Sequence, residues 1–474
     1  MNIRATFLML IAQIASLASG YGIQVFLARK LGVEGFGTFV VTFSMLMTIE
    51  FFVVAGIPNA LQKFIAETPE NSYGIHKKFF RWQLFYSVLI LAIAYFASPL
   101  IGSSLGDEKV SSLFRLALLD VLPFAFFWYY AGFQIGLKRF EKFAIVSIIF
   151  SSFKLISITS LVYLGFSVDG AFIGNACGSL IGMVVGCKFL SLEHTEIKPV
   201  SSHAREFIVA NIIYAIGLNL LYYIDIWFVK RFCTEDVVGF YGAASTLSRI
   251  PYVFSIALTG MILPTMAAAV RNNDRTEIRN LIHQSLRLAL ILFVPAAVLV
   301  QTWGLEISTF IFGGKYSGGI DYLRILFPGL SLLAIFSITN TMLMADKGMK
   351  TCGILVVGLS VCSIFLNSLL VPVFSALGAA MATTITLMIG VTVSAGLVVR
   401  NYKTLVPLRT IFRVFAAAAG LGLVSWSWVP ENALSFILGL GMLSVVYFTL
   451  LLFMGEVSQA DIQKVRLMVV KKFT

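Results

Sequence analysis

Five charged side chains stand inside stretches of the chain that are otherwise apolar and long enough to cross a membrane. They are Glu50, Asp120, Lys154, Asp225 and Arg249. A charge near the bilayer centre costs about 2.5 to 3.5 kcal/mol on insertion scales, so such residues usually face a bundle interior or a wet cavity. The chemistry open to them is the binding of ions or of a charged substrate in transit. These residues therefore indicate a transporter.

The depth of these charges separates them into roles. At 1.5 Å of helix rise per residue, Lys154, Arg249 and Asp120 each lie about eight to ten residues into their apolar stretch, near mid-depth. Glu50 lies slightly towards the cytoplasm and Asp225 nearer the outer face. A cation in low-dielectric surroundings can hold an anion, which makes Lys154 and Arg249 candidate substrate-binding residues. Alternatively, such a base neutralises a buried acid as a packing pair, Lys154 with Asp120 for example.

Polar residues near these charges recur at helical intervals and form stripes on the expected helices. A stripe facing a bundle interior lines something other than lipid, although small polar residues also serve helix packing. The candidate cavity residues outside the charged set are Gln13, Gln24, Asn211, Tyr214 and Tyr222.

Composition makes the chain an integral membrane protein. It has 474 residues, of which 58% are hydrophobic and 12% charged, and its mean hydropathy is +0.91. About 20 residues span the hydrocarbon layer, and the runs are continuously apolar rather than alternating, which favours helices over a barrel. The sequence predicts an all-α protein with about fourteen transmembrane helices, at 6–27, 38–58, 83–103, 112–135, 143–164, 168–190, 207–229, 240–263, 288–311, 323–345, 351–373, 375–399, 408–428 and 432–454.

Basic residues set the expected orientation. With the N-terminus in the cytoplasm, most lysines and arginines fall in cytoplasmic segments, and the outer loops hold only Arg29, Lys30, Lys109, Lys230, Arg231 and Lys315. The positive-inside rule then places both termini in the cytoplasm. The net charge of +12 thus has a topological explanation, and no nucleic-acid binding is expected. Five scattered cysteines without a CxxC pair and four scattered histidines predict no disulfide, no zinc site and no cofactor.

An internal repeat organises the chain. Residues 26–39 (FLARKLGVEGFGTF) align without gaps onto residues 228–241 (FVKRFCTEDVVGFY), which puts Gly37 on Gly239. An even number of spans per half makes this a parallel repeat about an axis along the membrane normal. The predicted domains are an N-lobe at 1–195 with helices 1–6, a C-lobe at 196–400 with helices 7–12, and helices 13–14 with a tail at 401–474. A central cavity is expected between the two six-helix lobes.

Several segments resemble the bacterial polysaccharide flippases of the multidrug, oligosaccharidyl-lipid and polysaccharide exporter superfamily. Residues 27–67 (LARKLGVEGFGTFVVTFSMLMTIEFFVVAGIPNALQKFIAE) are similar to the opening signature of that family. So are GLKRFEKFAI at 136–145, VVGFYGAASTLSRIPYVFSIALTGMILPTMAA at 237–268 and FLNSLLVPVFSALGAAMATTIT at 365–386. The resemblance covers nearly the whole chain but contains no catalytic motif.

The resemblance implies a function and assigns roles. Such flippases are thought to move undecaprenyl-pyrophosphate-linked oligosaccharide units, including O-antigen and other lipopolysaccharide precursors, to the outer leaflet by alternating access. The pyrophosphate would bind Lys154 and Arg249, with Arg29 and Arg231 as weaker candidates at the outer rim. The related lipid II flippases imply one metal site, for sodium, which would match Asp225, Asn367 and Thr383. Asp120, Glu50 or Asp225 could equally carry protons, so the coupling ion stays open.

Two other functions remain as alternatives. A drug or organic-cation antiporter of the same superfamily should have a cavity dominated by acids and aromatic rings, whereas here two bases lie at mid-depth. A membrane-embedded glycosyltransferase or polysaccharide polymerase should carry paired acids or arginines in a large outer loop, which the sequence lacks, so no enzyme is expected. The flippase interpretation predicts a monomer in a bacterial inner membrane. Its predicted partners are lipid-linked oligosaccharide, membrane lipid, and polymerase and glycosyltransferase proteins.

Overall fold

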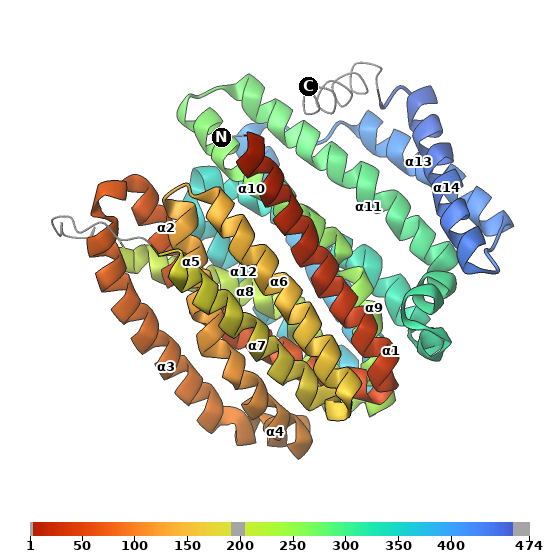
Figure 1. Ribbon diagram of the computed structural model, residues 1–474. Helices are drawn as coiled ribbons and strands as arrows, with labels where there is room; N and C mark the ends of the chain where they lie inside the picture. The colour runs from red at the N-terminus through yellow and green to blue at the C-terminus, as the bar shows by residue number, and fades with distance from the viewer. Residues whose placement is uncertain (1–2, 191–203, 458–474) are drawn as a thin grey trace. The chain divides into compact units, whose positions relative to one another are not determined.

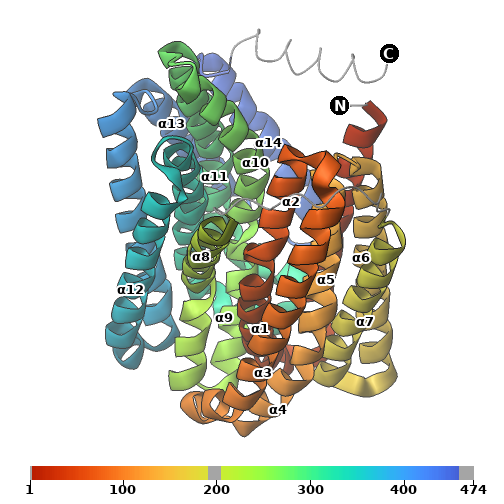
Figure 2. The same ribbon diagram turned by 90° about the vertical axis from the view of Figure 1, so that its left-hand side faces the viewer.

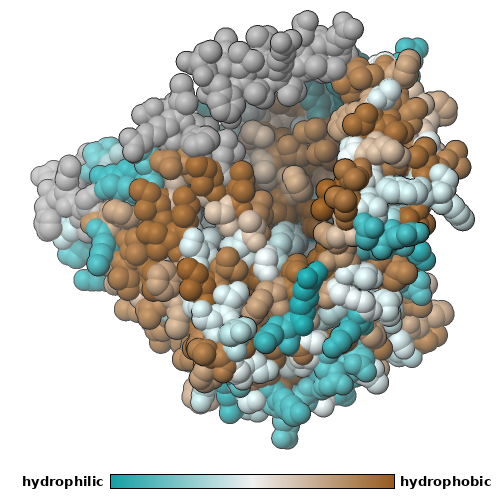
Figure 3. Space-filling view, turned by 45° about the vertical axis from the view of Figure 1, so that its right-hand side comes forward, coloured by the Kyte–Doolittle hydropathy of each residue, from teal (hydrophilic) through white to brown (hydrophobic). Residues whose placement is uncertain are grey.

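The computed structural model of the protein describes residues 3–190 and 204–457, which are helical almost throughout and contain no strand (Figure 1). Ten helical segments in these ranges are long and apolar enough to cross a membrane. Figure 3 shows large apolar areas on the left and upper right of this face, and hydrophilic side chains in its lower part and along its edges. The prediction of an all-α, multi-pass membrane protein is therefore confirmed.

Fourteen α-helices follow one another in the described part of the chain. The first eight are α1 (Ile3–Ala55), α2 (Ile57–Glu67), α3 (Ser72–Leu105), α4 (Glu108–Ala117), α5 (Val121–Gly136), α6 (Phe140–Leu161), α7 (Ser167–Lys188) and α8 (Ala204–Phe232). The others are α9 (Glu235–Ser248), α10 (Ile250–Arg271), α11 (Arg275–Phe312), α12 (Ile320–Tyr402), α13 (Leu408–Ser427) and α14 (Ala433–Phe453). Because some of these helices are short and others hold several apolar runs, they do not correspond one to one with the predicted spans.

Left-handed backbone conformations interrupt the three longest apolar segments. Gly32 in α1 has φ of 75°, Gly165 between α6 and α7 has 98°, and α12 contains Gly348 at 76° and Ser375 at 52°. A single crossing needs only ~20 residues, so each of these segments holds more than one. The three glycines fall in connections that the sequence predicts between two spans, and Ser375 is the first residue of the predicted span at 375–399. The count of fourteen crossings stays a prediction.

The chain divides into two compact units by its internal contacts. Unit 1 comprises Met1–Gly242 and Met349–Ala379, and unit 2 comprises Ala243–Gly348 and Ala380–Thr474. Residues 349–379 lie within α12, so this helix contributes to both units. The predicted lobe boundaries at 195/196 and 400/401 stay predictions.

Glycines draw α6 and α7 together within unit 1, and the two helices lie side by side in Figures 1 and 2. A Cβ atom on Gly174 would lie 2.7 Å from the Ile158 backbone, and one on Gly178 would lie 2.7 Å from the Lys154 Cα. Small residues four apart let two helix backbones approach closely in a membrane. This packing fixes the position of Lys154 on α6 against the polar residues of α7.

In unit 2, α11, α13 and α14 share an apolar core centred on Trp303. The Trp303 ring N–H donates to the carbonyl oxygens of Ser425 at 2.9 Å and Trp428 at 3.0 Å. This bond satisfies the one polar atom of a fully buried indole, as burial requires. Helices α13 and α14 are therefore packed onto α11 rather than separate from the rest of unit 2.

At the other end of this core, the chain after α14 turns back and buries Glu456. Its carboxylate accepts hydrogen bonds from Arg287 Nε at 2.8 Å and Thr410 Oγ1 at 3.1 Å, and Arg413 Nη1 lies 3.4 Å away. Arg413 also donates to the Gly455 carbonyl at 2.9 Å. One acid is thus compensated by two arginines, which joins the end of α14 to α11 and α13.

Candidate functional site

Three of the predicted charges lie together inside unit 1. Glu50 of α1 and Asp120, at the end of the turn before α5, are 1% and 0% exposed. Their carboxyl groups lie within hydrogen-bonding reach of each other, and the charge of Lys154 acts on both. The Lys154 ammonium also lies 5.8 Å and 5.6 Å from the ring centroids of Phe43 and Phe150. The structure therefore brings two buried acids and one half-buried base into a single cluster.

An amide that the sequence interpretation passed over completes this cluster. Asn175 of α7 is 3% exposed, and its Nδ2 donates to Asp120 Oδ2. Its signal in the sequence was weak, since a single amide between Gly174 and Gly178 looks like ordinary helix packing. The donated bond stabilises the Asp120 carboxylate in a place from which water is largely excluded.

The charge count of the cluster limits what it can do. One ammonium group can compensate one carboxylate, and two bare carboxylates cannot stay adjacent at low dielectric. The second carboxyl group must therefore hold a proton or a bound cation. This arrangement could take up and release one positive charge, and each such change alters how strongly Lys154 is held by its acidic neighbours.

Arg249 is the predicted cation of unit 2. It lies between α9, which ends at Ser248, and α10, which begins at Ile250, and it is 6% exposed. Pro251 in the first turn of α10 suits this position, because its missing N–H lacks a helical partner there anyway. Ser245 and Ser248 on the preceding turn are also fully buried, so Arg249 follows a turn whose polar side chains are shielded from the surroundings.

Asp225 of α8 is 2% exposed and already well bonded. One carboxylate oxygen accepts the Tyr241 hydroxyl at 2.6 Å, and the other accepts the Ile226 backbone N–H at 2.8 Å. These two donors hold the carboxylate in one orientation. A fixed buried carboxylate of this kind is the type of group that attracts a cation.

Helix α8 packs along residues 349–374 of α12, also within unit 1. The Ser360 hydroxyl donates to the Gly217 carbonyl at 2.9 Å, and farther along both helices the Cys233 side chain lies within hydrogen-bonding reach of Ser375. The contacts advance in the same order on both helices, which therefore run parallel.

Asp225 and Asn367 fall midway between these two contacts, so they lie at about the same level on adjacent helices. Asn367 is fully buried; its Nδ2 donates to the Ser363 carbonyl at 2.8 Å. Its Oδ1 has no hydrogen-bond partner among the described residues. The unpaired amide oxygen of Asn367 and the buried carboxylate of Asp225 are both oxygen ligands of the kind that cations such as sodium and calcium prefer. Thr383 belongs to unit 2, where its hydroxyl is also buried without a described partner.

The predicted cavity residues differ in exposure. Gln13 is exposed and Asn211 is buried, while Gln24, Tyr214 and Tyr222 are intermediate. The Asn211 side chain donates to its own helix, at the Phe207 carbonyl, over 2.8 Å. Their role in lining a cavity stays a prediction.

Two polar contacts between α1 and α8 were not predicted. The Thr48 hydroxyl donates to Asn219 Oδ1 at 2.6 Å, and the Trp227 ring N–H donates to the Ser44 hydroxyl at 2.8 Å. The stripe on α8 is thus partly a bonded interface with α1. Asn219 is separated from Asn211 by eight residues, a helical interval that could have included it in the predicted stripe.

The predicted rim cations Arg29 and Arg231 are both exposed. Beside them, Lys230 is 7% exposed, and its ammonium bonds the Asp107 carboxylate at 2.6 Å. Burial alone would raise the pKa of Asp107. The hydrogen bond and charge of Lys230, with the Lys109 backbone N–H, outweigh it and hold that pKa below its ordinary value. This buried pair was missed because both residues read as loop charges.

The two glycines that the repeat aligned meet each other within unit 1. A Cβ atom on Gly37 would lie 2.8 Å from the Gly239 backbone nitrogen. Two residues equivalent in a repeat come into contact when they lie at the axis relating the copies. The contact therefore agrees with a repeat between residues 26–39 and 228–241.

Comparison with known proteins agrees with this architecture. A family model described as "Polysaccharide biosynthesis protein" matches residues 3–270, more than half of the chain. The "Probable low-salt glycan biosynthesis flippase Agl15" of Haloferax volcanii is 23% identical over 77% of this chain and 77% of its own length.

Among solved structures, a "Lipid II flippase MurJ, inward closed conformation" is similar with a TM-score of 0.74 at 16% identity, over 96% of this chain and 99% of that one. An inward-facing multidrug resistance MATE family transporter of the MOP superfamily follows with a TM-score of 0.69 at 14% identity, over 83% and 99%. The chain therefore belongs to the polysaccharide biosynthesis protein family and has the fold shared by flippases and MATE transporters of the MOP superfamily.

Proposed function

We propose that the protein is a flippase that moves a lipid-linked oligosaccharide, carried on undecaprenyl pyrophosphate, from the cytoplasmic to the outer leaflet by alternating access. Family membership and a relative named a glycan biosynthesis flippase support the class of cargo. The observation that carries the proposal is the cluster that buried Glu50 and Asp120 form with half-buried Lys154. A chain that only anchored other proteins would gain nothing from such costly burial.

Lys154 and Arg249 supply the positive charge for the pyrophosphate in this proposal. A pyrophosphate carries at least two negative charges, and ammonium and guanidinium groups at low dielectric bind it through charge-assisted hydrogen bonds. Arg29 and Arg231, being exposed, serve as a first or last contact at the rim. The lipid tail stays in the bilayer while the head group follows the polar route.

The charge count of the cluster gives a mechanism for proton coupling. When Glu50 and Asp120 together hold one proton, Lys154 is balanced by a single carboxylate. A second proton frees its charge for the pyrophosphate, and release of protons draws it back. Sodium at Asp225 and Asn367, with Thr383 as the third ligand taken from the resemblance, is the competing coupling site.

A drug or organic-cation antiporter is the second candidate, because the fold also matches a MATE transporter. Such a cargo is a cation, and it would be repelled by Lys154 and Arg249. The two functions therefore predict opposite effects of removing these charges. Loss of either base should lower the transport rate of a flippase, whereas the transport rate of a cation exporter should stay the same or rise.

The test uses the full chain reconstituted in liposomes that contain undecaprenyl-pyrophosphate oligosaccharide. Appearance of the glycan on the protein's exit side is measured with an external glycosidase. We expect Lys154→Ala and Arg249→Ala each to slow the transfer at least tenfold and Lys154→Arg to retain more of it. Lys142→Ala, which removes a charge from the end of the same helix α6, is the matched control. Unchanged transfer in both alanine variants would remove the site assignment.

The proposal also covers the membrane in which the protein lies, its orientation, its oligomeric state and its partners. We place the protein in a bacterial inner membrane as a monomer with both termini cytoplasmic, serving O-antigen or related lipopolysaccharide synthesis. Its partners are then the glycosyltransferases that build the cargo and the polymerase that consumes it. Crosslinking in native membranes followed by identification of the captured proteins tests these partners.

A further inference from the structure

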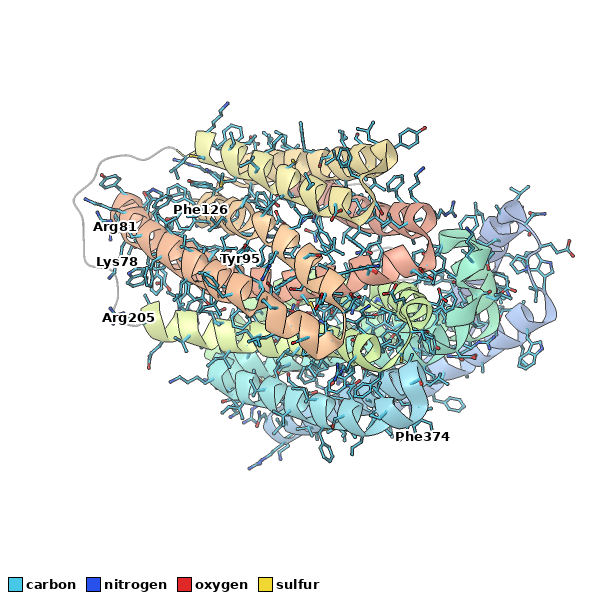
Figure 4. All side chains as sticks on the ribbon, turned by 90° about the horizontal axis from the view of Figure 1, so that it is seen from below. Lys78, Arg81, Tyr95, Phe126, Arg205 and Phe374 are labelled. Atoms are coloured by element: carbon cyan, nitrogen blue, oxygen red, sulfur yellow. The ribbon has the colours of Figure 1, made fainter. Side chains whose placement is uncertain are left out.

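Basic side chains gather where α3 and α8 begin, in unit 1. Lys77, Lys78 and Arg81 lie within the first three turns of α3, and Arg205 lies in the first turn of α8. All four side chains are exposed. Figure 4 shows Lys78 and Arg81 at one end of α3, Arg205 at the adjoining end of α8, and Tyr95 farther along α3. Two segments far apart in the sequence thus bring their positive charges to one place.

Trp82 is the point on which two of these cations converge. The Lys78 ammonium lies 5.0 Å from the centroid of the Trp82 ring, and the Arg205 guanidinium carbon lies 6.0 Å from it. The indole packs against Phe79, whose centroid is 5.3 Å away, and Phe79 is fully buried. The ring is therefore fixed from one side while cations approach it from two helices.

No carboxylate of the described residues forms an ion pair with Lys78 or Arg205. Glu206, the residue next to Arg205, lies 3.7 Å from Lys350 instead. Cation–π contacts lessen the cost of holding two like charges near one ring but do not neutralise them. An anion placed between Lys78 and Arg205 would neutralise them and would accept hydrogen bonds from both.

The surface next to these cations is apolar and exposed on both helices. On α3, one and two turns beyond Arg81, Phe85 is 72% and Val88 46% exposed. On α8, Val209 is 55% and Ile213 46% exposed, at helical intervals of four from Arg205. Charge followed by exposed apolar side chains on neighbouring helices matches an amphiphile with an anionic head and hydrocarbon tails.

We propose that Lys78, Trp82 and Arg205 form a binding site for the head group of an anionic phospholipid, whose acyl chains lie along Phe85, Val88, Val209 and Ile213. The predicted topology assigns this end of α3 to the cytoplasmic leaflet. Basic residues at that level attract anionic head groups, and tryptophan favours the membrane interface. The bound lipid ties α3 to the start of α8, and the site does not depend on which cargo the protein carries.

The test measures lipid binding to the full-length protein in detergent by native mass spectrometry. The probes are dioleoyl phosphatidylglycerol and dioleoyl phosphatidylcholine at equal concentration, which share their tails and differ in net charge. We expect the wild type to prefer phosphatidylglycerol and the double variant Lys78→Gln/Arg205→Gln to reduce that preference roughly tenfold. Lys142→Gln is the control, because Lys142 stands alone over a ring, 5.9 Å from the Phe189 centroid.

A second measurement uses Trp82 as the reporter and needs no charge removal. Phosphatidylglycerol with brominated tails should quench more tryptophan fluorescence in the wild type than in Trp82→Phe, and brominated phosphatidylcholine should show a smaller difference. Equal quenching by the two lipids, or an equal loss of preference in Lys142→Gln and the double variant, would overturn the proposal. Displacement of phosphatidylglycerol by undecaprenyl pyrophosphate at much lower concentration would overturn it in favour of a cargo site.

Discussion

The effect of substituting Lys154 depends on the net charge that it forms with Glu50 and Asp120, and not on its own charge alone. The charge of the ammonium acts on two carboxyl groups that lie within hydrogen-bonding reach of each other, and Asn175 already donates to Asp120. Removing the base alone leaves acids whose charge nothing nearby compensates, so they must take up protons. Removing the base and one acid together restores the balance between positive and negative charges in the cluster. The effects of the two substitutions on stability should therefore not be additive.

This coupling can be measured by a double-mutant cycle. We expect Lys154→Gln to lower the thermal stability of the detergent-solubilised protein and Asp120→Asn to recover part of the loss, with a coupling energy of about 1 to 3 kcal/mol. Unfolding is followed by the rise in cysteine reactivity on heating. Strictly additive effects of the two substitutions would show that the side chains do not interact.

Single residues were predictable from the sequence to different degrees. Glu50, Asp120 and Lys154 were found because a charge in an apolar span is conspicuous. Asn175 was not, because an amide costs far less to bury and is common in helix packing. Lys230 was counted as a loop charge, since nothing in its surroundings along the chain shows that Asp107, distant in sequence, bonds it at 2.6 Å.

At the scale of elements, glycines set how closely helices approach. The most demanding contact joins the segment after Gly32 to the start of α9, where the backbones of Gly37 and Gly239 meet. No side chain fits between them. Any added atom must push these two segments of the repeat apart.

We expect Gly239→Ala to destabilise the protein by about 1 to 3 kcal/mol, as overpacking of a close contact does. Gly22→Ala on α1 is the matched control, because a Cβ atom there meets nothing within 4 Å. The midpoint of thermal unfolding in detergent compares the two. A Gly239→Ala midpoint no lower than that of Gly22→Ala would mean that the segments separate without cost.

Helix breaks were predictable where glycine marked them. Gly32, Gly165 and Gly348 each adopt positive φ in a predicted connection, and glycine does so without a steric cost. Ser375 breaks α12 equally sharply at φ 52°. The sequence predicts a boundary one residue earlier, from the length of the apolar run, because serine carries no such signal.

At the scale of the whole molecule, hydropathy alone was enough for the fold class. It predicted a helical membrane protein, and the residue matches pointed to the family that the comparisons then showed. Which acids carry the coupling ion could not follow from hydropathy. Glu50 and Asp225 are equally conspicuous in the sequence, and their different partners emerge only in the structure.

The coupling ion can be decided by transport under imposed gradients. If protons drive the protein through the carboxyl pair, Glu50→Gln should abolish stimulation by a pH gradient, and Asp225→Asn should leave that stimulation intact. If sodium drives transport, Asp225→Asn should abolish stimulation by a sodium gradient, and Glu50→Gln should leave that stimulation intact. Glycan transfer in proteoliposomes is the readout, and stimulation by neither gradient in the wild type would contradict both couplings.

The bonds that Arg287, Thr410 and Arg413 make to Glu456 limit where the chain can be shortened or fused to another protein. A chain ended after Val457 keeps the carboxylate that Arg287 and Arg413 share. A chain ended at Gly455 removes the carboxylate that lies 2.8 Å from Arg287 and 3.4 Å from Arg413. Helix α14 would then loosen from α11 and α13, so a fusion partner belongs beyond this acid and never before it.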